Sequence, residues 1–351
     1  MKKYFLVLTL FIIWPLLLHA QDRPEEGALI DTIDTSVDLF NELDPMDITL
    51  TFDLKKYQRN KFEGKYIPVH FHYQINDTLG LEKMMRIKAR GQFRRSYCSF
   101  APFWLNIRKA NVKNQHLQDV KRMKIVTHCR SSKEYKEYLL KEYLTYKIFN
   151  ILSPVSFRVR LIRMKYVDTG RKGKVTESWA FIIEPEGLLA ERHDALAIKK
   201  DELSMRFMEP ESMDLVAIFM FMIGNSDYSI AGRHNVKILG LPGFGTDGYT
   251  PVPYDFDYSG IVNANYAVPG ENLGITSVEE RYYLGPCREE SGYQLAIQQI
   301  EEHRDEIFHL IHSFPHLKKG QKNEMINYLE SYFNLASNPV KIYSELNWSC
   351  R

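Results

Sequence analysis

Short stretches in which apolar and polar residues alternate fill much of the first half of the chain. A period of two is typical of strands that bury one face. It predicts strands at Ile48–Leu54, Tyr66–Ile75, Met84–Ala89, Phe103–Arg108 and Lys124–His128. Two longer strands, Ser156–Val167 and Val175–Glu184, are expected to form a hairpin around the basic turn Gly170–Lys174.

Helical spacing dominates elsewhere. Apolar and aromatic residues recur every three or four positions over Lys133–Leu152, which predicts a helix that Ser153-Pro154 ends. The segment Glu211–Gly224 is apolar on all sides, which is typical of a helix buried in the core. The other elements expected in this half are strands at Val236–Leu239 and Pro251–Asp255, and helices at about Gln294–Phe314 and Lys319–Ala336.

The order of these elements predicts an α+β protein. Strands come first, one helix and a hairpin follow, and helices then dominate, with a polar loop and a carboxylate-bearing strand among them. This is the layout of a two-lobed atypical protein-kinase-like fold. We expect a β-rich N-terminal lobe at 46–190 and a mostly helical C-terminal lobe at 191–351.

The first residues predict export. Two lysines precede the apolar run Tyr4–Leu18, and Ala20 follows it, as in a secretory signal peptide spanning 1–20. The run is shorter than the roughly 20 residues of a spanning helix, and Pro15 interrupts it; a retained N-terminal anchor is the alternative. Residues 21–45 form an acid-rich, flexible lead-in. We therefore expect a periplasmic, cell-surface or extracellular protein without a transmembrane domain in the mature chain.

The charge balance argues against a nucleic-acid partner. Removal of the signal takes away two of the 46 basic residues, which leaves 44 basic against 44 acidic residues. Nucleic-acid binders usually carry a clear basic excess. The residues specify neither the identity of a protein acceptor nor the oligomeric state.

Four cysteines occur in the chain. An exported chain with an even number of cysteines predicts disulfides, and four cysteines allow three pairings. We favour Cys98–Cys129 and Cys287–Cys350, because each pair is close in sequence and lies within one half of the chain. The alternative is four free thiols. Zinc is not expected, because no Cys-x-x-Cys occurs.

Polar residues that suit phosphate chemistry concentrate in Gly224–Gly260. The segment GNSDYSIAGRHN places Asp227 and Asn235 in a polar loop, and PVPYDFDYSG places Asp255 and Asp257 at a strand end. Residues two apart on a strand leave on one face. Carboxylate and amide oxygens suit Mg²⁺ or Mn²⁺, and Asp227 can accept the proton of a hydroxyl. Each motif alone is common in solvated turns, whereas their order indicates a site.

Together these motifs resemble those of the CotH-like (spore-coat protein H type) family of atypical secreted kinases. The matching residues are Asn225, Asp227, Asn235, Asp255, Asp257 and Gly260, with Tyr254 where Trp is common. Arg90-Gly91 is similar to the start of the family's Arg-Gly-x-Ser motif. The resemblance covers roughly Met84 to Tyr266.

The resemblance implies ATP as phosphate donor, Mg²⁺ or Mn²⁺ as metal, and secreted proteins as acceptors. It implies Asp227 as the base and Asn235, Asp255 and Asp257 as metal ligands. Arg90 would belong to the nucleotide-binding residues. Phosphoryl transfer requires such positioning and charge neutralisation.

The chain departs from the family pattern at three positions: Gln92 and Phe93 replace a serine pair, and Phe103 replaces a lysine. Lys124 is then our candidate for the lysine that contacts the phosphates, with Glu142 on the following helix as its ion-pair partner. The alternative is an exposed strand lysine and a solvated glutamate. If no lysine contacts the phosphates, the protein is a pseudokinase.

The predicted function is therefore transfer of the γ-phosphate of ATP to a protein hydroxyl. Two alternatives remain open at this point. One is an inactive kinase-like protein that serves as an envelope or surface scaffold, which would fold without metal and ignore nucleotide. The other is a metal-dependent phosphoesterase or nucleotidyl transferase, which would use the same acids without a protein acceptor.

Overall fold

The computed structural model describes residues 28–30, 32–33, 39–40, 44–77, 79–107, 111–112, 122–200, 202–243 and 248–351. The expected signal peptide and most of the acid-rich lead-in lie outside these residues. Within them, no helix has both the length and the apolar character needed to cross a membrane.

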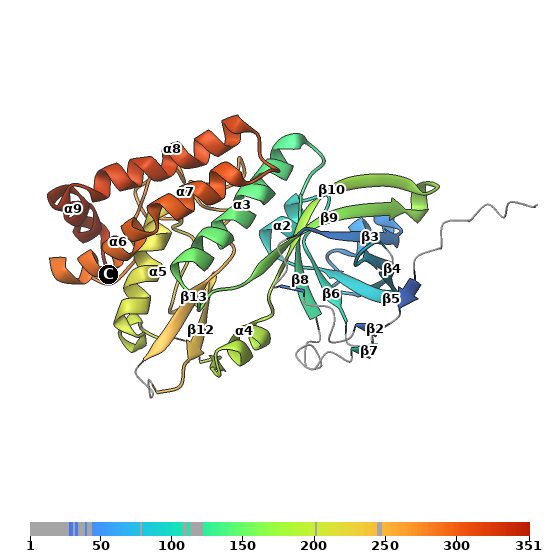
Figure 1. Ribbon diagram of the computed structural model, residues 1–351, viewed down its shortest axis with the longest axis horizontal. Helices are drawn as coiled ribbons and strands as arrows, with labels where there is room; N and C mark the ends of the chain where they lie inside the picture. The colour runs from blue at the N-terminus through green and yellow to red at the C-terminus, as the bar shows by residue number, and fades with distance from the viewer. Residues whose placement is uncertain are drawn as a thin grey trace, which may run out of the picture.

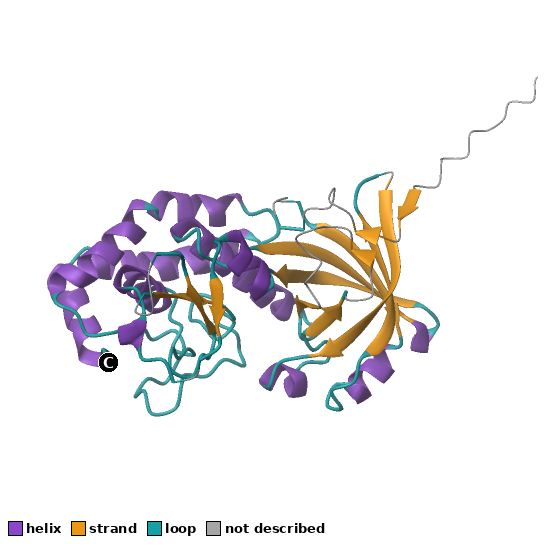
Figure 2. Cartoon of the chain, turned by 90° about the horizontal axis from the view of Figure 1, so that it is seen from below, coloured by secondary structure: helices purple, strands orange, loops and turns teal. Residues whose placement is uncertain are grey.

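Seven strands form a closed sheet at one end of the molecule (Figures 1 and 2). They follow one another around the barrel in the order β5 (Leu79–Ala89), β4 (Ile67–Gln74), β3 (Met46–Phe52), β9 (Val159–Asp168), β10 (Lys174–Ile183), β8 (Arg122–Thr127) and β6 (Phe103–Asn106). The pairing of β6 with β5 closes the barrel. The pairing of β3 with β9 is parallel, and the other neighbours in the ring are antiparallel.

Alternation along each strand fills the interior of this barrel. On β3 every second residue is buried, namely Met46, Ile48, Leu50 and Phe52. The same pattern on β4 buries Ile67, Val69, Phe71 and Tyr73. These side chains belong to one hydrophobic cluster, and each large apolar side chain removed from water contributes about 1.5–3 kcal/mol.

A second hydrophobic cluster lies among the helices. Helix α3 (Lys133–Leu152) contacts β9 and β10 on one side and α7 (Arg304–Ser313) on the other, and it lies between the barrel and the C-terminal helices (Figure 1). Helix α5 (Pro210–Met222) is buried from Met213 to its end. Glu209 caps α5 by accepting hydrogen bonds from the first backbone amides.

The other helices are α1 Leu54–Asn60, α2 Phe93–Tyr97, α4 Glu186–Arg192, α6 Glu290–Glu302, α8 Lys319–Ala336 and α9 Pro339–Ser349, with short 3₁₀ turns η2 Thr169–Arg171 and η3 Met205–Phe207. A three-stranded sheet is formed by β11 Leu196–Ile198, β12 Val236–Gly240 and β13 Tyr249–Pro253. Two short pairings involve β1 Ala28–Ile30, which lies beside β5, and β2 Thr32–Ile33, which lies beside β7 Asn111–Val112.

The expected two-lobed kinase-like fold is wrong. The strands of the first half close into a seven-stranded barrel, and the second half contains a three-stranded sheet as well as helices. Alternation predicts which face of a strand is buried, but it does not say which strand becomes its partner. Closure depends on β5, whose residues Arg86–Ala89 pair with β6 while Gly80–Ile87 pair with β4.

Most predicted elements occur close to their expected positions. The helices at Lys133–Leu152 and Lys319–Ala336 have the predicted bounds. The helix expected at about Gln294–Phe314 is two helices, α6 and α7, which meet at His303. The short helices α1, α2 and α4 and the C-terminal helix α9 were not expected.

Both favoured disulfides are confirmed. Cys98 is bonded to Cys129, and Cys287 is bonded to Cys350. The first joins the end of α2 to the segment that leads into α3. The second joins the segment before α6 to the end of α9. Two disulfides are consistent with an extracytoplasmic protein.

Candidate functional site

Two segments that are separate in sequence lie side by side at the end of the buried helix α5. Gly260 N donates a hydrogen bond of 3.0 Å to Gly224 O, and Ile261 N donates one of 3.1 Å to Ile223 O. Gly260 is required here, because a Cβ at this position would overlap Tyr328 Oη and lie 2.6 Å from Val278 O. These contacts place the Asp227–Asn235 loop against the segment that carries Asp255 and Asp257.

Asp227 is held in this loop by three neighbours. Its backbone N–H donates to Asn225 Oδ1 at 2.9 Å. Asn235 Nδ2 donates to the Asp227 carbonyl oxygen at 2.7 Å and to Oδ2 at 2.9 Å, while His234 Nε2 lies 3.0 Å from Oδ1. Neither bond uses the side-chain oxygen of Asn235. The carboxylate is therefore fixed in orientation, and Asn235 retains an oxygen that can act as a ligand.

A buried arginine joins the acids of the second segment to helix α3. Arg94 Nε donates to Asp257 Oδ2 at 2.8 Å, and Arg94 Nη2 donates to Glu142 Oε2 at 2.9 Å. The same Nη2 lies 3.7 Å from Asp255 Oδ1. Tyr266 also forms a hydrogen bond with Asp257. Three carboxylates and one guanidinium thus share a site in which Glu142, Asp257 and Arg94 are buried and Asp255 is half-buried.

The charged groups in this cluster change one another's pKa values. Burial raises the pKa of Glu142 to about 8, although Arg94 opposes the change. Burial also raises the pKa of Asp257. Burial opposes ionisation of Asp255 too, but Arg94, Arg90 and Lys124 outweigh it and hold the pKa of this carboxyl below its usual value. Asp255 is therefore the member of the cluster that stays ionised most readily.

The structure brings most of the predicted residues to one cavity of about 290 Å³. Residues that line it include Arg90, Asp227, Asn235, Asp255 and Asp257, together with Arg94, His234, Phe93 and Tyr258. Asp255 has a left-handed backbone (φ 66°), and its N–H donates to Tyr146 Oη of α3 at 2.7 Å. This bond compensates in part for the strained conformation, which is common at functional sites.

A second cavity of about 500 Å³ shares Arg90 and Gly91 with the first. Its lining is cationic and aromatic, with Arg90, Arg122, Lys124 and Lys237 beside Trp104 and Tyr254. Lys124 Nζ lies 4.2 Å from the centre of the Tyr254 ring. Burial, reinforced by Arg90, lowers the pKa of Lys124 to about 7.

One predicted contact does not form. Glu142 pairs with Arg94, whereas Lys124 lies in the cationic cavity and forms no ion pair with Glu142 among the described residues. The sequence reasoning selected Arg90 and overlooked Arg94, which lies four residues later on the five-residue helix α2. Only the unusual Arg94-Arg95 pair after Arg90-Gly91 could have drawn attention to it.

The residues that face the first cavity fit a hard divalent cation. Asp227, Asn235 and Asp255 provide carboxylate and amide oxygens, which Mg²⁺ and Mn²⁺ prefer. Oxygens of Glu142, Asp255 and Asp257 lie within 4.8 Å of one another. Glu142 Oε1 is buried and has no hydrogen-bond partner within the described part of the chain. Carboxylates outnumber cations in this cluster, and the resulting negative potential would attract a metal ion.

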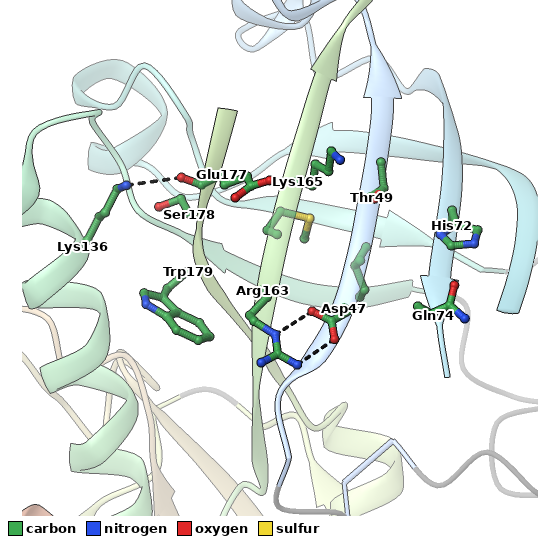
Figure 3. Close-up of a pocket in the computed structure, with 12 residues that line it drawn as sticks. Asp47, Thr49, His72, Gln74, Lys136, Arg163, Lys165, Glu177, Ser178 and Trp179 are labelled. Atoms are coloured by element: carbon green, nitrogen blue, oxygen red, sulfur yellow. Dashed lines mark hydrogen bonds and ion pairs between the residues drawn. The ribbon is translucent and has the colours of Figure 1, made fainter. Parts of the chain in front are cut away.

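A further cavity of about 440 Å³ lies on the outer face of the barrel (Figure 3). Arg163 and Asp47 border it with two parallel hydrogen bonds of 2.6 and 2.7 Å. Lys136 Nζ donates to the Glu177 carbonyl oxygen at 3.2 Å. None of the predicted site residues lines this cavity.

The comparisons with known proteins place the chain in no family. No family model matches it, and no curated protein matches it. Among solved structures, the crystal structure of a Helicobacter pylori proinflammatory kinase, CtkA, is similar over 70% of this chain and 92% of that chain. The identity is 12% and the TM-score is 0.39. These values carry no argument about activity, and the CotH-like family is not confirmed.

Proposed function

We propose that the chain is a metal-dependent phosphotransferase that moves the γ-phosphate of ATP to a protein hydroxyl. The observation that carries this proposal is the junction of two cavities. An acid-lined cavity with Asp227, Asn235 and Asp255 opens beside a cationic cavity with Lys124, and Arg90 lines both. Phosphoryl transfer needs this combination of positioned oxygens and phosphate-binding cations.

The cationic cavity suits a nucleotide. Trp104 and Tyr254 offer aromatic faces to a base, and Lys124, Arg90 and Lys237 offer positive charge to the phosphates. The phosphate chain would extend past Arg90 into the acid-lined cavity. Asn235 and Asp255 would hold a divalent ion there, and the ion would neutralise charge on the phosphates.

In this proposal Asp227 acts as the base. The acceptor hydroxyl oxygen would form a bond to the γ-phosphorus while the bond to the bridging β–γ oxygen breaks, and ADP would leave. The hydroxyl proton would pass to Asp227. Burial raises the pKa of this carboxyl, although His234 opposes the shift. A raised pKa brings a base closer to neutral pH, which favours proton transfer.

The first experiment measures thermal stability of the chain with ATP, with and without Mn²⁺. Binding at about 100 times the dissociation constant stabilises a fold by roughly 2.7 kcal/mol. We expect ATP to raise the melting temperature only when Mn²⁺ is present, and we expect Asp255→Asn to abolish this rise. Asp47→Asn, in the outer cavity, is the matched control and should retain the shift. No shift with any nucleotide would contradict the proposal and favour a scaffold.

A second experiment follows radiolabelled γ-phosphate. A phosphotransferase leaves label on protein, including the chain itself, whereas a phosphoesterase releases it as inorganic phosphate. We expect Asp227→Asn to lower transfer by about 10²- to 10⁴-fold, as for loss of a general base. ATP binding should persist in this variant. Release of phosphate without labelled protein would assign the site to hydrolysis instead.

A further inference from the structure

Arg94 occupies the position at which a cation would bind Glu142 and Asp257. Its Nη2 contacts Asp257 Oδ2 at 2.6 Å and Glu142 Oε2 at 2.9 Å. Both carboxylates are buried, and Glu142 does not line the acid-lined cavity, whereas Arg94 does. A cation that enters from the cavity therefore meets Arg94 and Asp255 before it can reach Glu142.

The helix that carries Arg94 is anchored at its C-terminal end. Cys98, which follows α2, is bonded to Cys129. Arg130 Nη2 also donates to the Tyr97 carbonyl oxygen at 3.2 Å. These contacts hold α2 against the segment that leads into α3, so the guanidinium is held in place by the fold itself.

We infer that Arg94 is a permanent counter-cation for Glu142 and Asp257, so that the site binds one divalent ion at Asp255 rather than two. This inference rests on the proposed metal-dependent function. The distances agree with it. Glu142 and Asp257 share the Arg94 guanidinium at 2.9 and 2.6 Å, whereas Asp255 Oδ1 lies 3.7 Å from Arg94 Nη2 and remains available to a divalent ion. A second divalent ion would need Arg94 to leave two buried carboxylates.

Isothermal titration of the full chain with Mn²⁺ alone, without the chelating nucleotide, tests this inference. We expect one ion per chain. Glu142→Gln, which still accepts a hydrogen bond from Arg94, should bind one ion with affinity within about threefold of wild type, less than 1 kcal/mol. Arg94→Met removes the counter-cation and should bind a second ion. Arg94→Met combined with Glu142→Gln should lose that second ion.

The outcomes separate this inference from the proposed function. Two ions in the wild-type chain, or a tenfold or larger loss of Mn²⁺ affinity in Glu142→Gln, would overturn the role of Arg94 and leave the phosphotransferase intact. No Mn²⁺ binding at all would overturn both. The wild-type and Glu142→Gln titrations decide the question even if Arg94→Met does not fold.

Discussion

Arg94 and Glu142 form a buried ion pair in which Nη2 and Oε2 are 2.9 Å apart. The two residues come from α2 and α3, and the disulfide between Cys98 and Cys129 ties the same two segments together. The pair therefore couples a short helix at the edge of the barrel to the long helix beside the second core. The same guanidinium also contacts Asp257, so this connection reaches the segment that carries the acids of the candidate site.

Loss of the Arg94 guanidinium should destabilise the protein in metal-free buffer. Arg94→Met keeps most of the side-chain volume but leaves Glu142 and Asp257 buried without a counter-charge, which typically costs about 3–5 kcal/mol. Urea unfolding in the presence of a chelator measures this cost. Arg163→Met is the control, because its partner Asp47 is exposed and such pairs contribute about 1 kcal/mol or less. An equal loss in the free energy of unfolding for the two variants would contradict the role of Arg94 as a buried counter-charge.

The hydrogen bond between Gly260 and Gly224 should not survive a side chain at Gly260. Gly260→Ala forces a methyl group into Tyr328 and the Val278 carbonyl oxygen, and overpacking of this kind costs about 1–3 kcal/mol. Thermal unfolding measures the loss. Gly320→Ala in α8 is the control, since nothing lies within 4 Å of its Cβ position. A neutral Gly260→Ala would mean that the two segments can separate freely.

His128 should make the barrel sensitive to mild acid. Its ring is fully buried beside Phe100 and Tyr166, and neither ring nitrogen has a hydrogen-bond partner among the residues that the structure describes. Burial, with a smaller contribution from Lys136, lowers its pKa to about 4. The folded state therefore disfavours the charged ring.

The stabilisation that the folded state gains from a neutral His128 is fully present above the unfolded-state pKa of about 6.5. It is lost as the pH falls towards 4, and the free energy of unfolding decreases by ~3 kcal/mol in total. Unfolding by urea at a series of pH values should show a loss in the wild type that His128→Leu lacks. Parallel curves for the two proteins would exclude His128 as the cause.

Lys124 should make nucleotide binding weaker at alkaline pH. With a pKa of about 7 in the free protein, it must take up a proton to pair with phosphate once the pH exceeds that value. The dissociation constant for ATP should then rise by up to about tenfold per pH unit between pH 7 and 9. Lys124→Arg keeps its charge over this range, so its affinity should stay flat. If the dissociation constant for ATP depended on pH equally in both proteins, Lys124 would not be a phosphate-binding residue.

Much of the local structure follows from local patterns. The helical spacing of Lys133–Leu152 and Lys319–Ala336 gave the observed bounds, and both disulfide pairs were those closest in sequence. The residues Asp227, Asn235 and Asp255 were selected from sequence and line one cavity. These features depend on neighbouring residues or on compact motifs, which a single sequence records directly.

The tertiary structure decided the rest. Closure of the barrel depends on pairing between β5 and β6, and the partner of Glu142 depends on where α2 packs against α3. Arg94 and Glu142 are 48 residues apart, and neither belongs to a repeating pattern that identifies the other. Periodicity specifies which face of an element is buried, whereas the packing of distant elements chooses its neighbours. For that reason the acids could be predicted from the sequence, but the arginine that neutralises them could not.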